Sequence, residues 1–202
     1  MNSRFFLKGL LVLLPLSSSF AHAKSPLDFG YSGSIGKKEP ASLYSKEQLR
    51  SSFDACVEQF PGRRPIDLRQ VSPALKPMAL CSDNFAVLYS QTSKTPIVVV
   101  QRLNAAQLLD AKDEERTNQF YADPRVPKSG RAELSDYKGA NPAVDRGHQF
   151  PAADSPTSNS MAQSFALSNM IPQDPKSNRG AWSKIESDVR KFTKRAAGSV
   201  YV

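Results

Sequence analysis

The residues with the clearest capacity for chemistry lie in the second half of the chain. His148 and Arg146 belong to the sequence Asp145-Arg146-Gly147-His148, and Asn178 and Glu186 follow downstream. A neutral imidazole can take a proton from water, and a planar guanidinium can bind phosphate oxygens. This combination suits hydrolysis of a phosphodiester by water.

The same residues limit the metal that could assist. Zinc sites use several histidine or cysteine ligands, and His148 has no second histidine near it. Mg²⁺ keeps most of its waters and accepts one or two protein oxygens. We therefore expect Asn178 to bind Mg²⁺ directly, with Mn²⁺ or Ca²⁺ as alternatives. On a regular helix Glu186 would lie about 80° round the axis from Asn178, so we expect it to contact the metal's waters.

Each of these residues also has a purely structural interpretation. A lone histidine such as His148 is often a packed core residue, and Arg146 could form a surface ion pair. Asn178 could satisfy backbone donors in a first helical turn. Glu186 could be an ordinary exposed helix residue, and Asp145 could cap or orient its turn.

The first half of the chain predicts a helix followed by a β-hairpin. Ser45 and Gln48 have the spacing of a capping box, and apolar residues at helical spacing continue to Pro61. The β-prone runs 85–89 and 97–100 predict an antiparallel hairpin, with one strand buried on both faces. Residues 104–116 are expected to be helical, and 121–144 to be irregular.

The second half predicts a short strand and a final helix. We expect the strand at 165–167, ending at Ser168-Asn169-Met170, and Ser177 as the N-cap of the helix. The helix carries an apolar stripe that we expect to be core, formed by Trp182, Ile185, Val189 and Phe192. Its basic residues are a solvated face or, alternatively, a contact for a nucleic-acid backbone: Lys184, Arg190, Lys191, Lys194 and Arg195.

The N-terminal residues resemble a targeting segment. Arg4 and Lys8 precede an apolar run and the sequence Ala21-His22-Ala23, so we expect residues 1–23 to be a secretory signal peptide, with an uncleaved anchor as the alternative. Residues 24–44 predict a flexible leader and 45–202 the folded domain. The formal charge of +8 falls by two to +6 when Arg4 and Lys8 are removed, which favours polyanionic partners. We expect a periplasmic or secreted protein without stable membrane association after cleavage.

The two cysteines, Cys56 and Cys81, fit an exported protein. An even pair in an oxidising compartment predicts a disulfide. Zinc thiolates are the alternative, but partner ligands are missing.

Taken in order, these motifs resemble the DNA/RNA non-specific endonuclease family, the sugar-non-specific branch of the ββα-metal nucleases. The matching residues are Asp136-Tyr137, Asp145-Arg146-Gly147-His148, Pro151-Ala152-Ala153-Asp154, Ser168-Asn169-Met170-Ile171-Pro172-Gln173, Asn178-Arg179-Gly180-Ala181-Trp182 and Glu186.

The resemblance implies a role for each matching position. His148 corresponds to the general base and Asn178 to the magnesium ligand. Arg146 and Glu186 correspond to positions that support the phosphate and the hydrated metal, and Asn169 to a polar position near the substrate. Arg116 corresponds to an upstream arginine that binds phosphate. The substrates implied are DNA and RNA, cut with little sequence preference to leave 5′-phosphates.

We therefore expect an α+β fold: a central antiparallel sheet with helices and a ββα-metal (His-Me finger) active site. The resemblance also implies later strands and a C-terminal helix beyond Val202, so we expect a domain truncated at its C-terminus. The expected function is metal-dependent endonuclease activity. The alternatives are an inactive remnant that binds nucleic acid and a phosphodiesterase for small substrates. The sequence does not indicate the oligomeric state.

Overall fold

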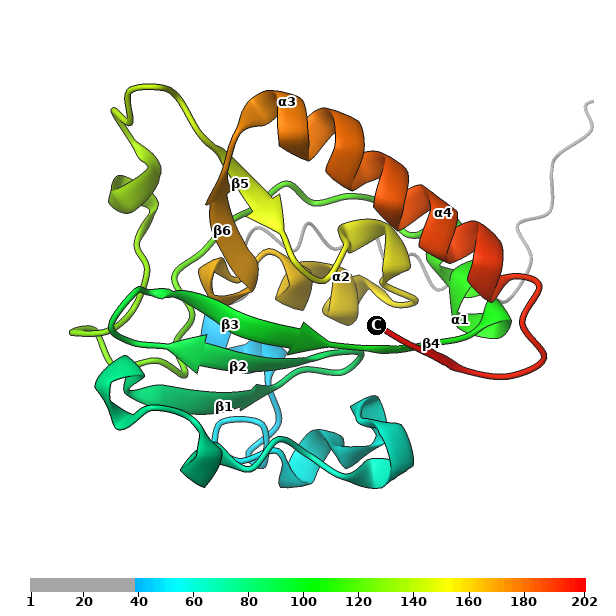
Figure 1. Ribbon diagram of the computed structural model, residues 1–202, viewed down its shortest axis with the longest axis horizontal. Helices are drawn as coiled ribbons and strands as arrows, with labels where there is room; N and C mark the ends of the chain where they lie inside the picture. Colours follow the sequence, from blue (N-terminus) through cyan, green and yellow to red (C-terminus); the bar gives the residue numbers. More distant parts are fainter. Residues whose placement is uncertain (1–38) are drawn as a thin grey trace, which may run out of the picture. The chain divides into compact units, whose positions relative to one another are not determined.

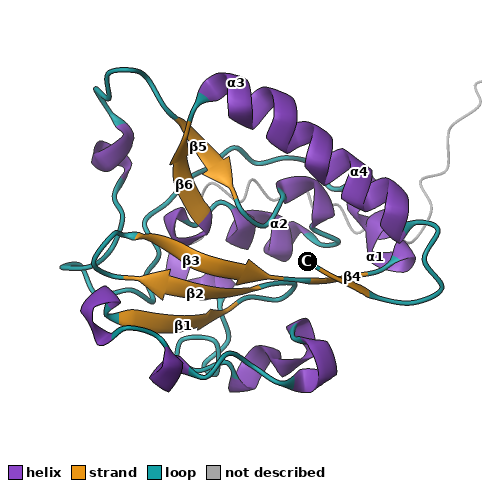
Figure 2. Cartoon of the chain, viewed as in Figure 1, coloured by secondary structure: helices purple, strands orange, loops and turns teal. Residues whose placement is uncertain are grey.

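The computed structural model describes residues 39–202, and its strands form three antiparallel sheets (Figures 1 and 2). The first sheet has three strands in the order β1-β2-β3. The second pairs β4 with β7, and the third pairs β5 with β6. The strands are β1 (Pro77–Cys81), β2 (Ala86–Ser90), β3 (Thr95–Val100), β4 (Arg102–Leu103), β5 (Asp145–His148), β6 (Met170–Gln173) and β7 (Val200–Tyr201).

The helices are short except for one rod near the C-terminal end of the sequence. They are α1 (Ala105–Asp110), α2 (Ser158–Ser164), α3 (Pro175–Ser177) and α4 (Ser183–Thr193), and a π-helical turn, Asn178–Trp182, joins α3 to α4. Within residues 39–202 no helix is long and apolar enough to cross a membrane. The predicted signal peptide, 1–23, lies outside the described residues. The α+β class with an antiparallel sheet is confirmed.

The predicted hairpin is confirmed as β2 and β3. Every residue of β2 is buried, as expected for a strand covered on both faces. Alternate side chains of a strand point to opposite faces. Ala86 and Leu88 accordingly pack with Phe53 and Phe60, whereas Val87 and Tyr89 join the cluster that includes Phe150 on the other face. That second face is the one toward the predicted site, because Phe150 follows β5 by two residues.

The predicted disulfide is present. Cys56 and Cys81 are bonded with their Cα atoms 5.5 Å apart, and both are fully buried. The bond ties the segment before the sheet to the end of β1. A loop of this length is expected to add about 3 kcal/mol of stability.

The helix predicted from Ser45 does not form, and only its first signal is correct. Ser45 and Gln48 exchange both capping hydrogen bonds, at 2.9 and 3.2 Å. The chain then bends, and a distorted 3₁₀ helix occupies Asp54–Gln59. The backbone leaves helical geometry at Cys56, which is bonded to Cys81 on β1, while Phe53 and Phe60 pack with both cysteines in one cluster against the sheet. Tertiary packing overrides the local signal.

Two buried residues precede the predicted domain boundary at residue 45. Leu43 and Tyr44, expected in the flexible leader, are 6% and 7% exposed. Tyr44 shares a hydrogen bond of 2.7 Å with Tyr121.

Two predicted elements near the site are misplaced. The strand expected at 165–167 is absent: Phe165 ends α2, Leu167–Asn169 is a 3₁₀ turn, and the strand begins at Met170. The loop expected after Asp154 instead contains α2, which Thr157 caps by accepting a hydrogen bond from the Ser160 N–H. The expected helix at 104–116 is limited to α1 and one 3₁₀ turn.

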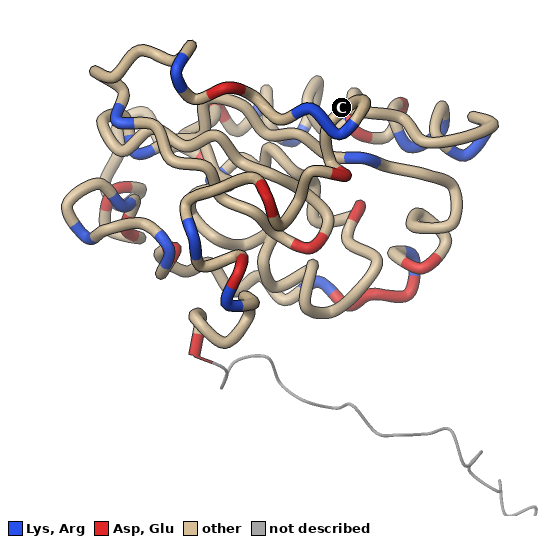
Figure 3. Tube along the Cα trace, turned by 90° about the horizontal axis from the view of Figure 1, so that it is seen from below, with Lys and Arg blue, Asp and Glu red and all other residues tan. Residues whose placement is uncertain are grey.

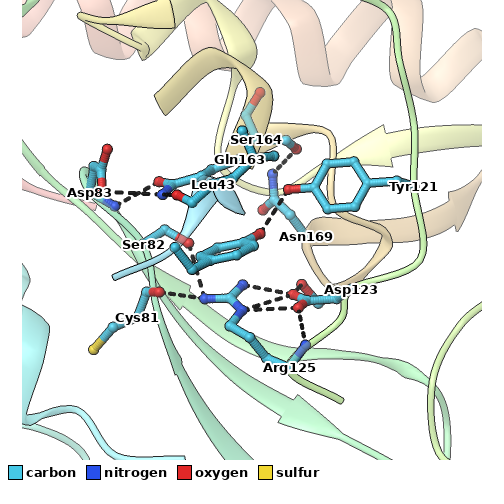
Figure 4. A network of polar contacts seen from close by, with 12 residues as sticks. Leu43, Cys81, Ser82, Asp83, Tyr121, Asp123, Arg125, Gln163, Ser164 and Asn169 are labelled. Carbon is cyan, nitrogen blue, oxygen red and sulfur yellow. Dashed lines mark hydrogen bonds and ion pairs between the residues drawn. The ribbon is translucent and has the colours of Figure 1, made fainter. Parts of the chain in front are cut away.

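A buried ion pair anchors the irregular segment 121–144 to the rest of the fold (Figure 4). Arg125 and Asp123 are paired at 2.6 Å with both side chains 1% exposed. Arg125 also donates to the carbonyl of Cys81, and Asp123 accepts from the Ser168 hydroxyl. The pair therefore connects β1 to the turn that leads into β6. The guanidinium of Arg125, 4.0 Å from the ring centroid of Tyr44, also covers that ring.

Candidate active site

The site is built on the antiparallel strand pair β5-β6 and the helical segment α3-α4 beside it (Figure 1). Asp145 lies opposite Gln173, and His148 lies opposite Met170. The two strands and the helix that follows form the expected ββα arrangement.

Glycine at position 147 is required by the partner strand. An added Cβ would overlap Oε1 of Gln173 and lie 2.9 Å from its Cβ. The Gln173 side chain thus crosses the strand where Gly147 has none, and this close approach explains the third residue of the motif.

His148 lies at the end of β5 and is nearly buried, at 8% exposure. Its ring packs against Phe165 and Phe120, with centroids 4.9 and 5.7 Å away. The Nε2 atom is buried and has no hydrogen-bond partner among residues 39–202. Burial lowers the pKa of His148 to about 3, and the charges of Arg116 and Arg146 contribute in the same direction. The imidazole is therefore neutral at pH 7 and able to accept a proton.

Two arginines flank the imidazole through these aromatic rings. The guanidinium of Arg146 lies 4.2 Å from the Phe120 centroid, and that of Arg116 lies 5.0 Å from the Phe165 centroid. Burial lowers the pKa of Arg116, while nearby Glu186 opposes the shift. The predicted phosphate-binding arginines therefore lie beside the predicted base, and the phenyl rings that support them were not foreseen. Aromatic residues in an irregular segment give no sequence signal of that role.

Asn169 does not lie where the resemblance implied. It is fully buried, and its amide donates to the carbonyls of Phe150 and Ser164 at 3.0 and 2.9 Å. Its Oδ1 accepts from the Phe150 N–H at 2.8 Å. These bonds occupy the side chain and exclude it from the substrate. Asn169 instead holds the chain leaving His148 against α2, so it is a positioning residue.

Asn178 is oriented by the first residue of the motif. Its Nδ2 donates to Asp145 Oδ2 at 2.9 Å, and Asp145 is held in turn by Arg179 at 2.7 Å. The hydrogen bond from Arg179, and to a smaller extent that from Asn178, lowers the pKa of Asp145. The orientation leaves Oδ1 of Asn178 without a hydrogen-bond partner in the described part of the chain. Asp145 therefore orients Asn178, whereas the sequence indicated only a role in capping or orienting its own turn.

The helix begins one turn earlier than predicted. Asp174, rather than Ser177, is the N-cap, and its side chain accepts from the Ser177 N–H at 2.9 Å. Pro175 occupies the first helical position, where a missing N–H costs nothing.

A π turn changes the relation between Asn178 and Glu186. The N–H of Ser183 reaches the carbonyl of Asn178, five residues back. A π-bulge absorbs one residue, so the eight-residue separation behaves as seven residues of α-helix. The angle between the two positions then falls from about 80° to about 20°. The expectation that they face apart, based on a regular helix, is wrong.

Trp182 links the helix to the base. Its indole N–H donates to the backbone carbonyl of His148 at 3.0 Å. It was expected to be simple core packing, but it is half-buried and fixes the distance between strand and helix.

Glu186 is half-buried on the same rod. Burial raises the pKa of its carboxyl, while the charge of Arg190 opposes the shift. The charges of Asp154 and Arg116 also shift this pKa. Glu186 therefore lies close enough to Arg116 to interact with it electrostatically.

The rest of the apolar stripe on α4 is not core. Ile185 is 53% exposed and Phe192 57%, and Val189 is partly buried. Helical spacing identifies an apolar face but not what covers it, and both Ile185 and Phe192 remain more than half exposed.

The donors fit a hydrated hard cation better than a protein cage. Among the described residues, no group of three or more histidine, cysteine or acidic side chains could hold a metal. The free Oδ1 of Asn178 is a neutral hard donor, and the orphaned Nε2 of His148 is available for a water. One amide ligand with water completing the shell is typical of Mg²⁺.

Comparisons with known proteins point to one family. A family model described as DNA/RNA non-specific endonuclease matches residues 69–202. The mitochondrial nuclease EXOG of Homo sapiens is 29% identical over 195 residues, covering 96% of this chain and 48% of that protein. Nuclease C1 of Cunninghamella echinulata is 34% identical over 123 residues, covering 59% of this chain and 48% of that protein.

A bacterial relative and a solved structure extend the comparison. A nuclease of Nostoc sp. is 32% identical over 115 residues, covering 56% of this chain and 40% of that protein. A chain in the crystal structure of the EndoG/EndoGI complex matches with a TM-score of 0.56 and 25% identity, covering 61% of this chain and 50% of that one. This chain therefore spans half or less of the length of these relatives.

Proposed function

Since the chain belongs to the DNA/RNA non-specific endonuclease family, a family of metal-dependent nucleases, we propose that it hydrolyses DNA and RNA at a site formed by His148, Asn178 and their arginine neighbours. We further propose that the metal is Mg²⁺, with Mn²⁺ as an alternative.

One observation carries the proposal. The base-competent imidazole and the free amide oxygen are fixed to each other by two hydrogen bonds between strand and helix. Trp182 binds the carbonyl of His148, and Asp145 binds the amide of Asn178. A histidine that only packed in the core would not need these hydrogen bonds to connect it to an oriented amide side chain.

The chain's own residues divide the chemistry of phosphodiester hydrolysis. His148 accepts a proton from a water whose oxygen attacks phosphorus. Arg116 and Arg146 neutralise charge on the non-bridging oxygens as it develops. The P–O bond to the 3′ oxygen breaks, leaving a 5′-phosphate, and the 3′ oxygen takes a proton from solvent. The phenyl rings and burial keep the imidazole unprotonated before attack.

Asn178 would hold the metal through Oδ1, and Glu186 would accept hydrogen bonds from the waters around it. When bound, the metal supplies Lewis acidity and charge for the leaving oxygen.

Individual arginine and lysine side chains, rather than one uniformly basic face, support binding of nucleic acid. Basic and acidic positions are intermixed along the trace (Figure 3), so contact with the phosphate backbone depends on particular arginines and lysines. Contacts to phosphate without reading of base edges fit weak sequence preference. The signal-like residues 1–23 and the disulfide support a periplasmic or secreted location.

A cleavage assay tests the proposal. The purified chain, with residues 1–23 removed, is incubated with plasmid DNA and with RNA, in Mg²⁺ and in EDTA. We expect both substrates to be cut only with metal. The variants His148→Ala and Asn178→Ala should lose cleavage by a factor of 10² or more, on the order of the contribution of a general base.

Ser177→Ala is the matched control, because Ser177 is exposed and its hydroxyl makes no hydrogen bond within residues 39–202. It should cleave at the wild-type rate. Cleavage that persists in EDTA and in His148→Ala would defeat the mechanism. Salt-sensitive retention of DNA without cleavage would favour the alternative of a non-catalytic binder.

A further inference from the structure

A hollow of about 340 Å³ opens beside Arg116, and the chemistry proposed above does not use it. We call it the flanking pocket. Its apolar lining comes from α1, the turn Ala152–Asp154 and α2. Leu108, Ala152 and Met161 contribute to this lining and are 5%, 3% and 2% exposed. The apolar lining is therefore fixed by core packing and not by mobile surface side chains.

The rim of the flanking pocket is mainly basic. Four cationic side chains line it against one carboxylate, Glu114; the cations are Lys112, Arg116, Arg190 and Lys194. Arg190 is engaged with Asp154 at 3.1 Å. Lys112 and Lys194 form no ion pair within residues 39–202, so both remain available to an anion.

The pocket adjoins the imidazole. Arg116 lines the pocket, and its guanidinium covers Phe165, whose ring in turn contacts His148 edge-on. One arginine and one phenyl ring thus separate the pocket from the proposed base. A strand whose scissile phosphate lies at His148 would place an adjoining nucleotide at this opening.

We propose that the flanking pocket binds the nucleotide next to the scissile phosphodiester, an inference that rests on the proposed function. The base enters the hollow beside the exposed Ala153, with Leu108, Ala152 and Met161 beneath it, and the flanking phosphate lies between Lys112 and Lys194. Every base has an apolar face, so such packing tolerates any sequence. Lysine binds phosphate as a point charge, without selecting an orientation.

The salt dependence of binding tests the electrostatic half of this proposal. Affinity of a single-stranded oligonucleotide is measured by fluorescence anisotropy in EDTA at several salt concentrations, for Lys194→Ala and Lys191→Ala. Both changes remove one charge near the end of α4, but Lys191 is paired with Asp188 and lies outside the pocket. Loss of one phosphate contact lowers the slope of log K against log salt by about 0.7. We expect that reduction in Lys194→Ala alone; equal slopes in both variants would overturn the assignment.

A steric variant tests the apolar half without changing charge. Ala153 lines the pocket and is exposed, so Ala153→Phe fills it without disturbing the core. Ala197→Phe, at an exposed position outside the pocket, is the control. With Mg²⁺ and a short oligonucleotide, Ala153→Phe should raise KM several-fold, whereas the control should not. An unchanged KM would rule out occupation of the pocket by substrate.

The outcomes separate the two proposals. Wild-type cleavage together with equal salt slopes and equal KM values would overturn the pocket and leave the hydrolytic function standing. A slope difference without cleavage would show that nucleic acid contacts the pocket, but it would overturn hydrolysis and with it the assignment to the nucleotide beside a scissile bond.

Discussion

Deleting Gly180, in the middle of the π turn, should preserve the site. The turn absorbs one extra residue between Asn178 and Glu186. Without Gly180, a regular α-helix spans the same interval with seven residues, and the two side chains stay within about 20° of each other. Glycine inside a helix costs about 1 kcal/mol relative to alanine, so stability should hold or rise by up to that amount. Trp182 would keep its bond to His148, because its spacing from Asn178 shortens in the same way.

Deleting Lys184 is the matched control, because it removes one residue from the regular helix and leaves the π turn in place. Glu186 would then rotate by about 100° relative to Asn178. Thermal unfolding and plasmid cleavage are measured for both deletions. We expect near wild-type cleavage without Gly180 and a large loss without Lys184. Higher cleavage without Lys184 than without Gly180 would refute the conclusion that the π turn brings Glu186 to the same side of the helix as Asn178.

Three further changes test the frame around the site. Gly147→Ala should destabilise the protein by about 1–3 kcal/mol through overpacking against Gln173, and Gln173→Ala should relieve part of this in the double variant; additive losses in urea unfolding would contradict the assigned clash. As pH falls from 6.5 toward about 3, the unfolded chain takes up a proton at His148 that the folded chain excludes, so stability should decrease. His148→Phe should weaken that dependence in pH-resolved unfolding, and an unchanged slope would contradict it. Replacing Cys56 and Cys81 by serine together should cost about 2–4 kcal/mol in thermal unfolding, and an unchanged melting temperature would contradict the disulfide's role.

Much of the site could be predicted because its chemistry depends on residue type. Arg146 and His148 lie on β5, Arg116 reaches His148 through the Phe165 ring, and Asn178 is hydrogen-bonded to Asp145 on the same strand. Composition alone could not have supplied this result; it came from the order of the motifs.

Where prediction failed, long-range packing decided the outcome. The capping bonds at Ser45 formed, yet no helix followed, because the chain breaks helical geometry at Cys56, where it is bonded to Cys81 on the sheet. Asn169 is polar and close to the motif, but its neighbours' backbone groups, rather than a substrate, satisfy it. No local pattern distinguishes those partners.

The rotation of Glu186 illustrates a different limit. Helical wheels assume one hydrogen-bond period, and the sequence gives no reliable sign of a single π turn. Ile185 and Phe192 show the same limit for packing. Helical periodicity identifies an apolar face but not the residues that cover it, and both side chains are exposed.

The central claim is that His148 and Asn178 act on the same phosphodiester. It is tested by kcat for His148→Ala, Asn178→Ala and the double variant in Mg²⁺. Residues of one catalytic unit are strongly non-additive. The account predicts that the double variant is no slower than the slower single variant. Independent, multiplicative losses would contradict it.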